Sequence, residues 1–100
     1  MLSSTELEKL RAYLAVQPIR KAFLFGSYSR NEDEAESDID LLIEFEKEDK
    51  KIGLVKFISI KLDLEEIFQK KVDLLEEGGI SKYIARAIDR EKKLVYEKQA

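Results

Sequence analysis

The chain contains no cysteine and no histidine among its 100 residues. The lack of both excludes disulfide bonds, Cys/His zinc sites, thiol nucleophiles and histidine-based catalytic triads. A metal ion bound here would therefore depend on carboxylate and carbonyl oxygens. Only four glycines are present, and no Gly-Lys-Ser/Thr or G-x-G-x-x-G pattern occurs, so neither classical nucleotide-binding loop is available.

The composition also lacks an excess of basic residues and a long apolar segment. The net charge of −3 argues against a surface that coats nucleic acid, so we expect no direct nucleic-acid binding. No apolar run approaches membrane-spanning length and the N-terminus is amphipathic, which predicts a cytoplasmic protein without a membrane segment. With 44% hydrophobic and 39% charged residues, residues 1–100 are expected to form one domain.

The spacing of apolar residues predicts helices and strands in turn. A first helix is expected over residues 4–16, ended by Pro18, the only proline. Further along the chain, the pattern predicts strands over 19–25, 37–46 and 71–75, a long helix over 52–70 and an amphipathic helix over 80–88. Residues 93–97 fit either a last short strand or a continuation of that helix.

One stripe of the long helix is expected to face the core; its members are Leu54, Phe57, Ile60, Leu64, Ile67 and Phe68. Two crossovers of the β-α-β kind would join the three main strands in one sheet.

The most informative stretch runs from Phe23 to Phe45. An apolar strand ends there at Gly26-Ser27, a polar segment follows, and Asp38-Ile39-Asp40 opens a second apolar run. Alternation along a strand directs Asp38 and Asp40 to the same side. Two like charges at the end of a buried strand are unfavourable unless a divalent cation binds them, and Mg²⁺ or Mn²⁺ suits such oxygen ligands.

A third acid and a turn complete the predicted site. Asp73 lies between apolar residues of the third strand, which the crossovers would place beside Asp38 and Asp40. Gly26-Ser27, followed by a short helical turn through Ser29 or Arg30, would present free backbone amides to phosphate oxygens. Three carboxylates beside a phosphate site predict that a nucleoside triphosphate and two metal ions bind there. The metal ions would stabilise the attacking and leaving oxygens of an in-line displacement that releases pyrophosphate.

These residues also carry a family resemblance. Gly26-Ser27, ten further residues and Asp38-x-Asp40 match the signature G-S-x10-D-x-D, so the chain resembles the DNA polymerase β-like nucleotidyltransferase superfamily and, within it, the minimal nucleotidyltransferases (MNT domains). The likeness covers essentially all of the chain. It implies an α/β (α+β) fold in which helices pack against a small mixed sheet that carries the acids. It also implies Mg²⁺-dependent transfer of a nucleoside monophosphate, AMP from ATP.

The resemblance implies a role for each acid. Asp38 and Asp40 look like the paired metal ligands of the family. Asp73 looks like its third acid, a metal ligand that also suits activation of the acceptor hydroxyl. All three would therefore be catalytic residues.

The same resemblance implies that Gly26 and Ser27 form the turn that binds the triphosphate. Arg30 matches a basic residue common after this turn in the family. It would contact phosphate or form a salt bridge with the acidic loop 31–36, and the sequence leaves both open. Asn31 stands where many relatives have glycine, a departure that concerns the geometry of the loop.

Many MNT domains are antitoxins encoded beside a helical HEPN ribonuclease toxin, and some AMPylate that toxin on tyrosine. The resemblance therefore implies a HEPN-type partner protein as acceptor, paired with a monomer of this chain. A chain of 100 residues agrees with this expectation, because its acceptor site must come from another protein or a second subunit.

Two other interpretations of the residues stay open. The three acids could be solvated or turn-forming residues at strand ends, without any ligand. The domain could also be a non-catalytic binding module that neutralises a partner protein by occlusion.

Overall fold

The computed structural model of the chain describes residues 2–26, 38–46, 53–76 and 82–98. They form, in order, α1 (Ser4–Ala15), β1 (Ile19–Phe25), β2 (Ile39–Phe45), α2 (Leu54–Phe68), β3 (Val72–Glu76), α3 (Lys82–Glu91) and β4 (Lys93–Glu97). These helices and strands confirm the predicted ones, with ends that differ by a few residues. None of the helices in this part of the chain is long and apolar enough to span a membrane.

Residues 93–97 form a strand and do not continue α3. β4 pairs antiparallel with β1, and Ala22 lies opposite Tyr96. At the junction, the ammonium of Lys92 lies 4.4 Å from the centre of the Phe23 ring. Pairing with a distant strand therefore decides the structure of a segment whose own sequence fits both a strand and a helix.

The four strands form one mixed sheet in the order β3-β2-β1-β4. β2 and β3 are parallel and are joined by α2, which confirms one of the two predicted crossovers. The other prediction is wrong, because β1 and β2 are antiparallel, with Phe25 opposite Asp40. An antiparallel pair needs no crossover, so the chain returns along the strand that it has just left.

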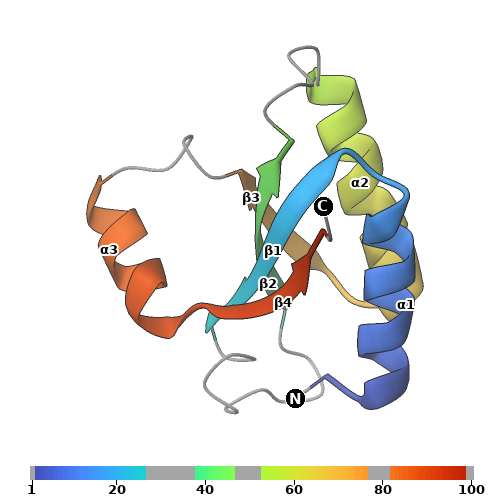
Figure 1. Cartoon of the computed structure of the whole chain (residues 1–100), viewed down its shortest axis with the longest axis horizontal. Helices are drawn as coiled ribbons and strands as arrows, with labels where there is room; N and C mark the ends of the chain where they lie inside the picture. Colours follow the sequence, from blue (N-terminus) through green and yellow to red (C-terminus); the bar gives the residue numbers. More distant parts are fainter. Residues whose placement is uncertain (1, 27–37, 47–52, 77–81, 99–100) are drawn as a thin grey trace.

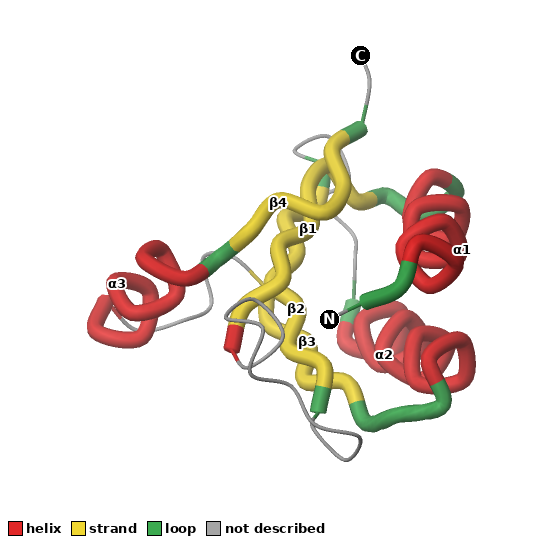
Figure 2. The backbone as a smooth tube through the Cα atoms, turned by 90° about the horizontal axis from the view of Figure 1, so that it is seen from below, coloured by secondary structure: helices red, strands yellow, loops and turns green. Residues whose placement is uncertain are grey.

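Two helices cover one side of the sheet, and α3 lies on the other side (Figures 1 and 2). Between the sheet and the two helices α1 and α2 lies the core, which includes alternate residues of the central strand β2. Its fully buried members include Leu10, Leu14, Ile39, Leu41, Ile43, Ile60 and Leu64. The predicted core stripe of α2 needs one correction, because Leu54, in the first turn of the helix, is 72% exposed.

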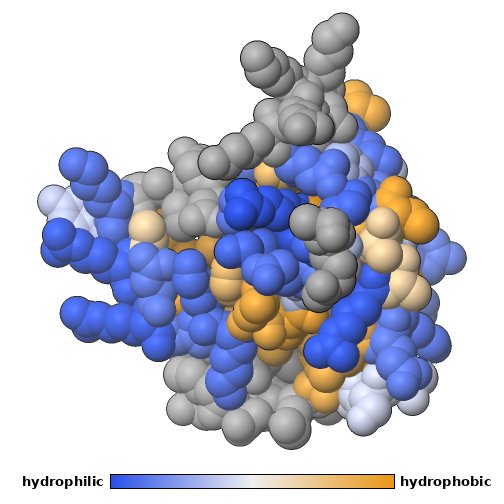
Figure 3. Space-filling model, in the orientation of Figure 1, coloured by the Kyte–Doolittle hydropathy of each residue, from blue (hydrophilic) through white to orange (hydrophobic). Residues whose placement is uncertain are grey.

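Polar contacts fix α1 to its neighbours. The capping box of Ser3 and Glu6 begins the helix, and the Tyr13 hydroxyl donates a hydrogen bond to Asp63 of α2 at 2.6 Å. Arg11 donates from Nε to the carbonyl of Val95 in β4, at 3.0 Å. Arg11 also borders a groove between α1 and β4, the region where apolar side chains gather on the face shown in Figure 3.

Candidate active site

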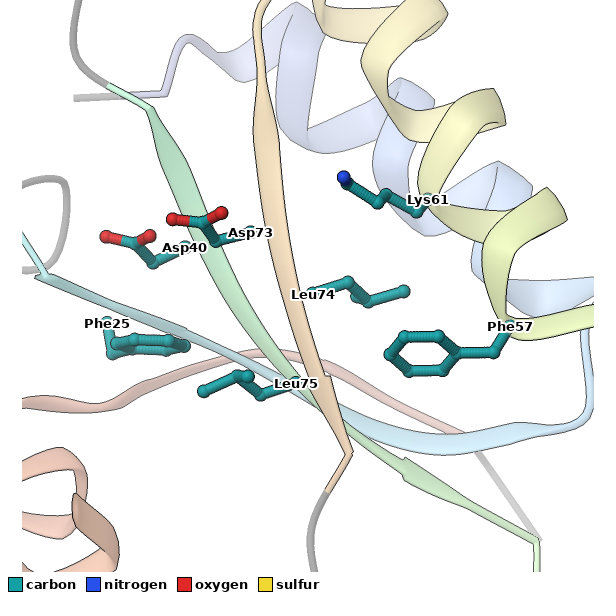
Figure 4. Close-up of a pocket in the computed structure, with 7 residues that line it drawn as sticks. All are labelled: Phe25, Asp40, Phe57, Lys61, Asp73, Leu74 and Leu75. Carbon is teal, nitrogen blue, oxygen red and sulfur yellow. The ribbon is translucent and has the colours of Figure 1, made fainter. Parts of the chain in front are cut away.

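Asp40 and Asp73 lie side by side on the two parallel strands. The register of β2 and β3 pairs Ile39 with Val72, Asp40 with Asp73 and Leu41 with Leu74. Neighbouring strands are about 4.8 Å apart, and residues in register point to the same face. Figure 4 shows the two carboxylates next to each other. The predicted meeting of an acid from each strand is therefore present.

Burial of the flanking residues directs both acids away from the core. Ile39 and Leu41 are fully buried against the helices, and Val72 and Leu74 are nearly so. Because side chains alternate along a strand, the residues between them must point to the opposite face. Asp40 is half-buried there and Asp73 is exposed. The apolar residues of each strand thus fix the orientation of its acid.

Gly26 completes this arrangement from β1. Its φ is +72°, a left-handed conformation that glycine adopts without steric penalty. A Cβ at this position would lie 2.1 Å from Oδ2 of Asp40, far inside any permitted contact. Any other residue here would need both a strained left-handed backbone and a shift of the Asp40 carboxylate.

The other predicted residues are not all placed beside this pair. Asp38 is exposed and precedes β2 by one residue, and it does not line the cavity that contains Asp40 and Asp73. Ser27 and Arg30 lie outside the described residues, as do the short helical turn and the loop 31–36.

The donor set suits a magnesium ion that is shared with a phosphate ligand. Among the described residues, no three His, Cys, Asp or Glu side chains are grouped so that they could hold an ion. Mg²⁺ is usually bound through one or two carboxylates together with substrate phosphates, and keeps several waters. Asp40 and Asp73 supply two adjacent carboxylates of this kind, so the residues present fit such an ion.

A cavity of about 340 Å³ opens at these carboxylates and continues around the edge strand β3 toward α2. Its lining combines two acids, one lysine and four apolar residues: Phe25, Asp40, Phe57, Lys61, Asp73, Leu74 and Leu75. Sequence reasoning missed Lys61. The available signal was its position four residues after Phe57, which places both on one side of α2.

Comparison with known proteins gives consistent matches. Residues 8–100 match the family model described as Polymerase beta, Nucleotidyltransferase. The protein adenylyltransferase MntA of Thermococcus cleftensis is 36% identical over 73 residues, which are 73% of this chain and 71% of the relative.

Solved structures share the fold. One assigned as a minimal nucleotidyltransferase has a TM-score of 0.70 at 30% identity, and the match covers 92% of this chain and 98% of that one. A toxin–antitoxin complex with AMP-PNP matches with a TM-score of 0.75 at 20% identity, over 98% and 76% of the two chains. A tri-AMPylated Shewanella oneidensis HEPN toxin in complex with MNT antitoxin matches at 0.71 and 17%, over 98% and 75%.

Proposed function

The chain belongs to the polymerase β nucleotidyltransferase family, and on this premise we propose that it transfers AMP from ATP to a hydroxyl group of a partner protein, as the antitoxin of a HEPN/MNT pair. One observation carries the proposal: Asp40 and Asp73 are in register on parallel strands, with Gly26 against the Asp40 carboxylate. The named relative is a protein adenylyltransferase, and two matched structures are toxin–antitoxin complexes.

We assign the acids to the metal ions and the turn that begins at Gly26 to the phosphates of the nucleotide. We assign Asp38, Asp40 and Asp73 as ligands of Mg²⁺, two ions when ATP is bound. Bound Mg²⁺ would stabilise the negative charge of the phosphate oxygens during displacement. Gly26 and Ser27, with Arg30, are assigned to the outer phosphates. Gly26 supports this assignment because it brings the end of β1 against Asp40.

The acceptor reacts on the exposed side of the pair. Asp73 accepts the proton of the acceptor hydroxyl, whose oxygen then attacks the α-phosphorus of ATP. A bond forms between this oxygen and phosphorus, while the bond from the α-phosphorus to the bridging oxygen breaks and pyrophosphate leaves. The exposure of Asp73 supports this role, because a side chain that is open to solvent can meet a hydroxyl carried by another protein.

The test is transfer of label from α-labelled ATP, in the presence of Mg²⁺, to the HEPN-type protein encoded beside the chain. We expect label on the partner with the wild type, and a loss of at least about 100-fold with Asp40→Asn or Asp73→Asn. Glu76→Gln is the matched control, since Glu76 is an exposed acid of β3 that does not line the cavity. It should leave transfer unchanged.

Two outcomes separate catalysis from simple binding. Loss of label with the Asp73 variant, while the two proteins still co-elute, supports the transferase. If the wild type co-elutes with the partner but neither labels it nor releases pyrophosphate, the chain is a binding module that acts by occlusion, and the proposed reaction is wrong.

A further inference from the structure

A cation shares the cavity with the two acids. Lys61 lines it from the middle of α2 and is half-buried. Figure 4 shows its side chain extending from α2 toward β3, with the carboxylates of Asp40 and Asp73 together on the other side of that strand. The ion pairs found within the described residues use other basic side chains, and Lys61 takes part in none of them.

A half-buried lysine that shares a cavity with two carboxylates would be expected to pair with one of them if its role were structural. Lys61 instead extends from the opposite side of the edge strand. Its charge is therefore directed at the space of the cavity, where a bound ligand with a negative or partly negative oxygen would lie.

The sheet arranges the site residues in a fixed order. Gly26 directly follows β1, Asp40 lies on β2 and Asp73 on the edge strand β3, and Lys61 lies beyond that edge on α2. In an in-line displacement, the attacking and leaving oxygens are on opposite sides of phosphorus. If the pyrophosphate leaves at Gly26, the acceptor approaches from the side of Asp73 and Lys61.

We propose that Lys61 is an acceptor-side catalytic residue whose ammonium contacts the acceptor oxygen as it attacks. This inference rests on the proposed function. As the hydroxyl proton moves to Asp73, negative charge develops on the acceptor oxygen, and a cation positioned beside it stabilises that charge. Lys61 itself stays protonated and exchanges no atom. Its contribution is to the acceptor step and not to the affinity for ATP.

The experiment compares the wild type with Lys61→Gln, Lys61→Arg and Lys56→Gln in the label-transfer reaction. The concentration of the HEPN-type partner is varied at saturating ATP, then that of ATP at saturating partner, and AMP-PNP binding is measured by calorimetry. Lys56 is an exposed lysine of the same helix outside the cavity, so its variant is the matched control.

We expect Lys61→Gln to lower kcat/KM for the partner at least about tenfold, with KM for ATP and AMP-PNP affinity within about twofold of the wild type. Lys61→Arg should restore most of the rate, and Lys56→Gln should match the wild type. A loss of AMP-PNP affinity comparable to the loss in kcat/KM for the partner, or unchanged kinetics in Lys61→Gln, would overturn the inference and leave the proposed function intact. An inactive wild type overturns both.

Discussion

Replacement of Gly26 by alanine separates the requirements of the fold from those of the site. The added Cβ would lie 2.1 Å from Oδ2 of Asp40, where ordinary contact begins at 3.4 Å, so the carboxylate must move by more than 1 Å. The backbone at Gly26 would also hold a non-glycine residue at φ +72°. These two effects can be measured apart, because only the first depends on Asp40.

The conformational effect alone destabilises the folded chain by about 1–2 kcal/mol. The clash adds a coupling between the two positions that we expect to lie between about 0.5 and 3 kcal/mol. Asp40→Ala removes the clashing oxygens, so Gly26→Ala in that background should show the conformational effect only. Displacement of Asp40 by about 1 Å should lower AMP transfer about 100-fold in the single variant.

Denaturant unfolding of the four chains in this cycle gives the coupling, and label transfer gives the activity. Gly53→Ala is the control, because a Cβ there meets nothing within 4 Å and the φ of Gly53 is −85°. It should leave transfer unchanged. The reasoning fails if Gly26→Ala is equally destabilising with and without Asp40, or if the single variant transfers AMP at the wild-type rate.

Three further outcomes follow from the structure. Leu41→Ala, in a fully buried position of the central strand, should reduce the free energy of unfolding by about 2–5 kcal/mol, whereas Leu62→Ala, at 57% exposure, should change it by less than about 0.5 kcal/mol; denaturant titration decides. Tyr13→Phe should be destabilising by about 1 kcal/mol through the lost hydrogen bond to Asp63. Burial first, then the hydrogen bond and charge of Asp63, raise the pKa of Tyr13 above its ordinary 10.0, so this stabilisation is fully present below pH 10 and is lost as the pH rises through the folded-state pKa. Unfolding of both chains at about pH 8 and pH 11 should therefore give a smaller difference at the higher pH. Chelation by EDTA should abolish AMP transfer, and added Mg²⁺ should restore it, while circular dichroism shows unchanged secondary structure; a loss of helix signal would contradict binding at the site alone.

Local sequence patterns predict most of the helices and strands and the orientation of Asp40 and Asp73. Apolar spacing predicts every helix and strand from α1 to α3, because burial of one face dominates the choice of structure, but it leaves residues 93–97 open. Alternation in β2 and β3 predicts that Asp40 and Asp73 point away from the core, and the crossover through α2 predicts that their strands are parallel neighbours. The roles of the candidate residues, Asp38 included, stay predictions until the variants are measured.

Strand direction was decided only by the tertiary structure. Two parallel crossovers would have placed the end of β1 beside Phe45, at the far end of β2 from Asp40. The observed antiparallel pair puts Phe25 opposite Asp40, so Gly26 lies against the Asp40 carboxylate. Apolar alternation is the same in either direction, and therefore the sequence pattern cannot distinguish them.

Contacts between residues distant in sequence also decided which side chains of α2 are buried, the structure of residues 93–97 and the position of Lys61. Leu54 fits the apolar stripe of α2 but is exposed, and residues 93–97 become a strand because β1 offers an edge. Lys61 reads as one more solvated charge on a helix until β3 brings the acids to the same cavity. Sequence alone determined the alternation of buried residues along β2 and β3 and the acids that interrupt it. The tertiary structure determined which of them meet, because contact across a sheet depends on strand order and direction, which local periodicity does not encode.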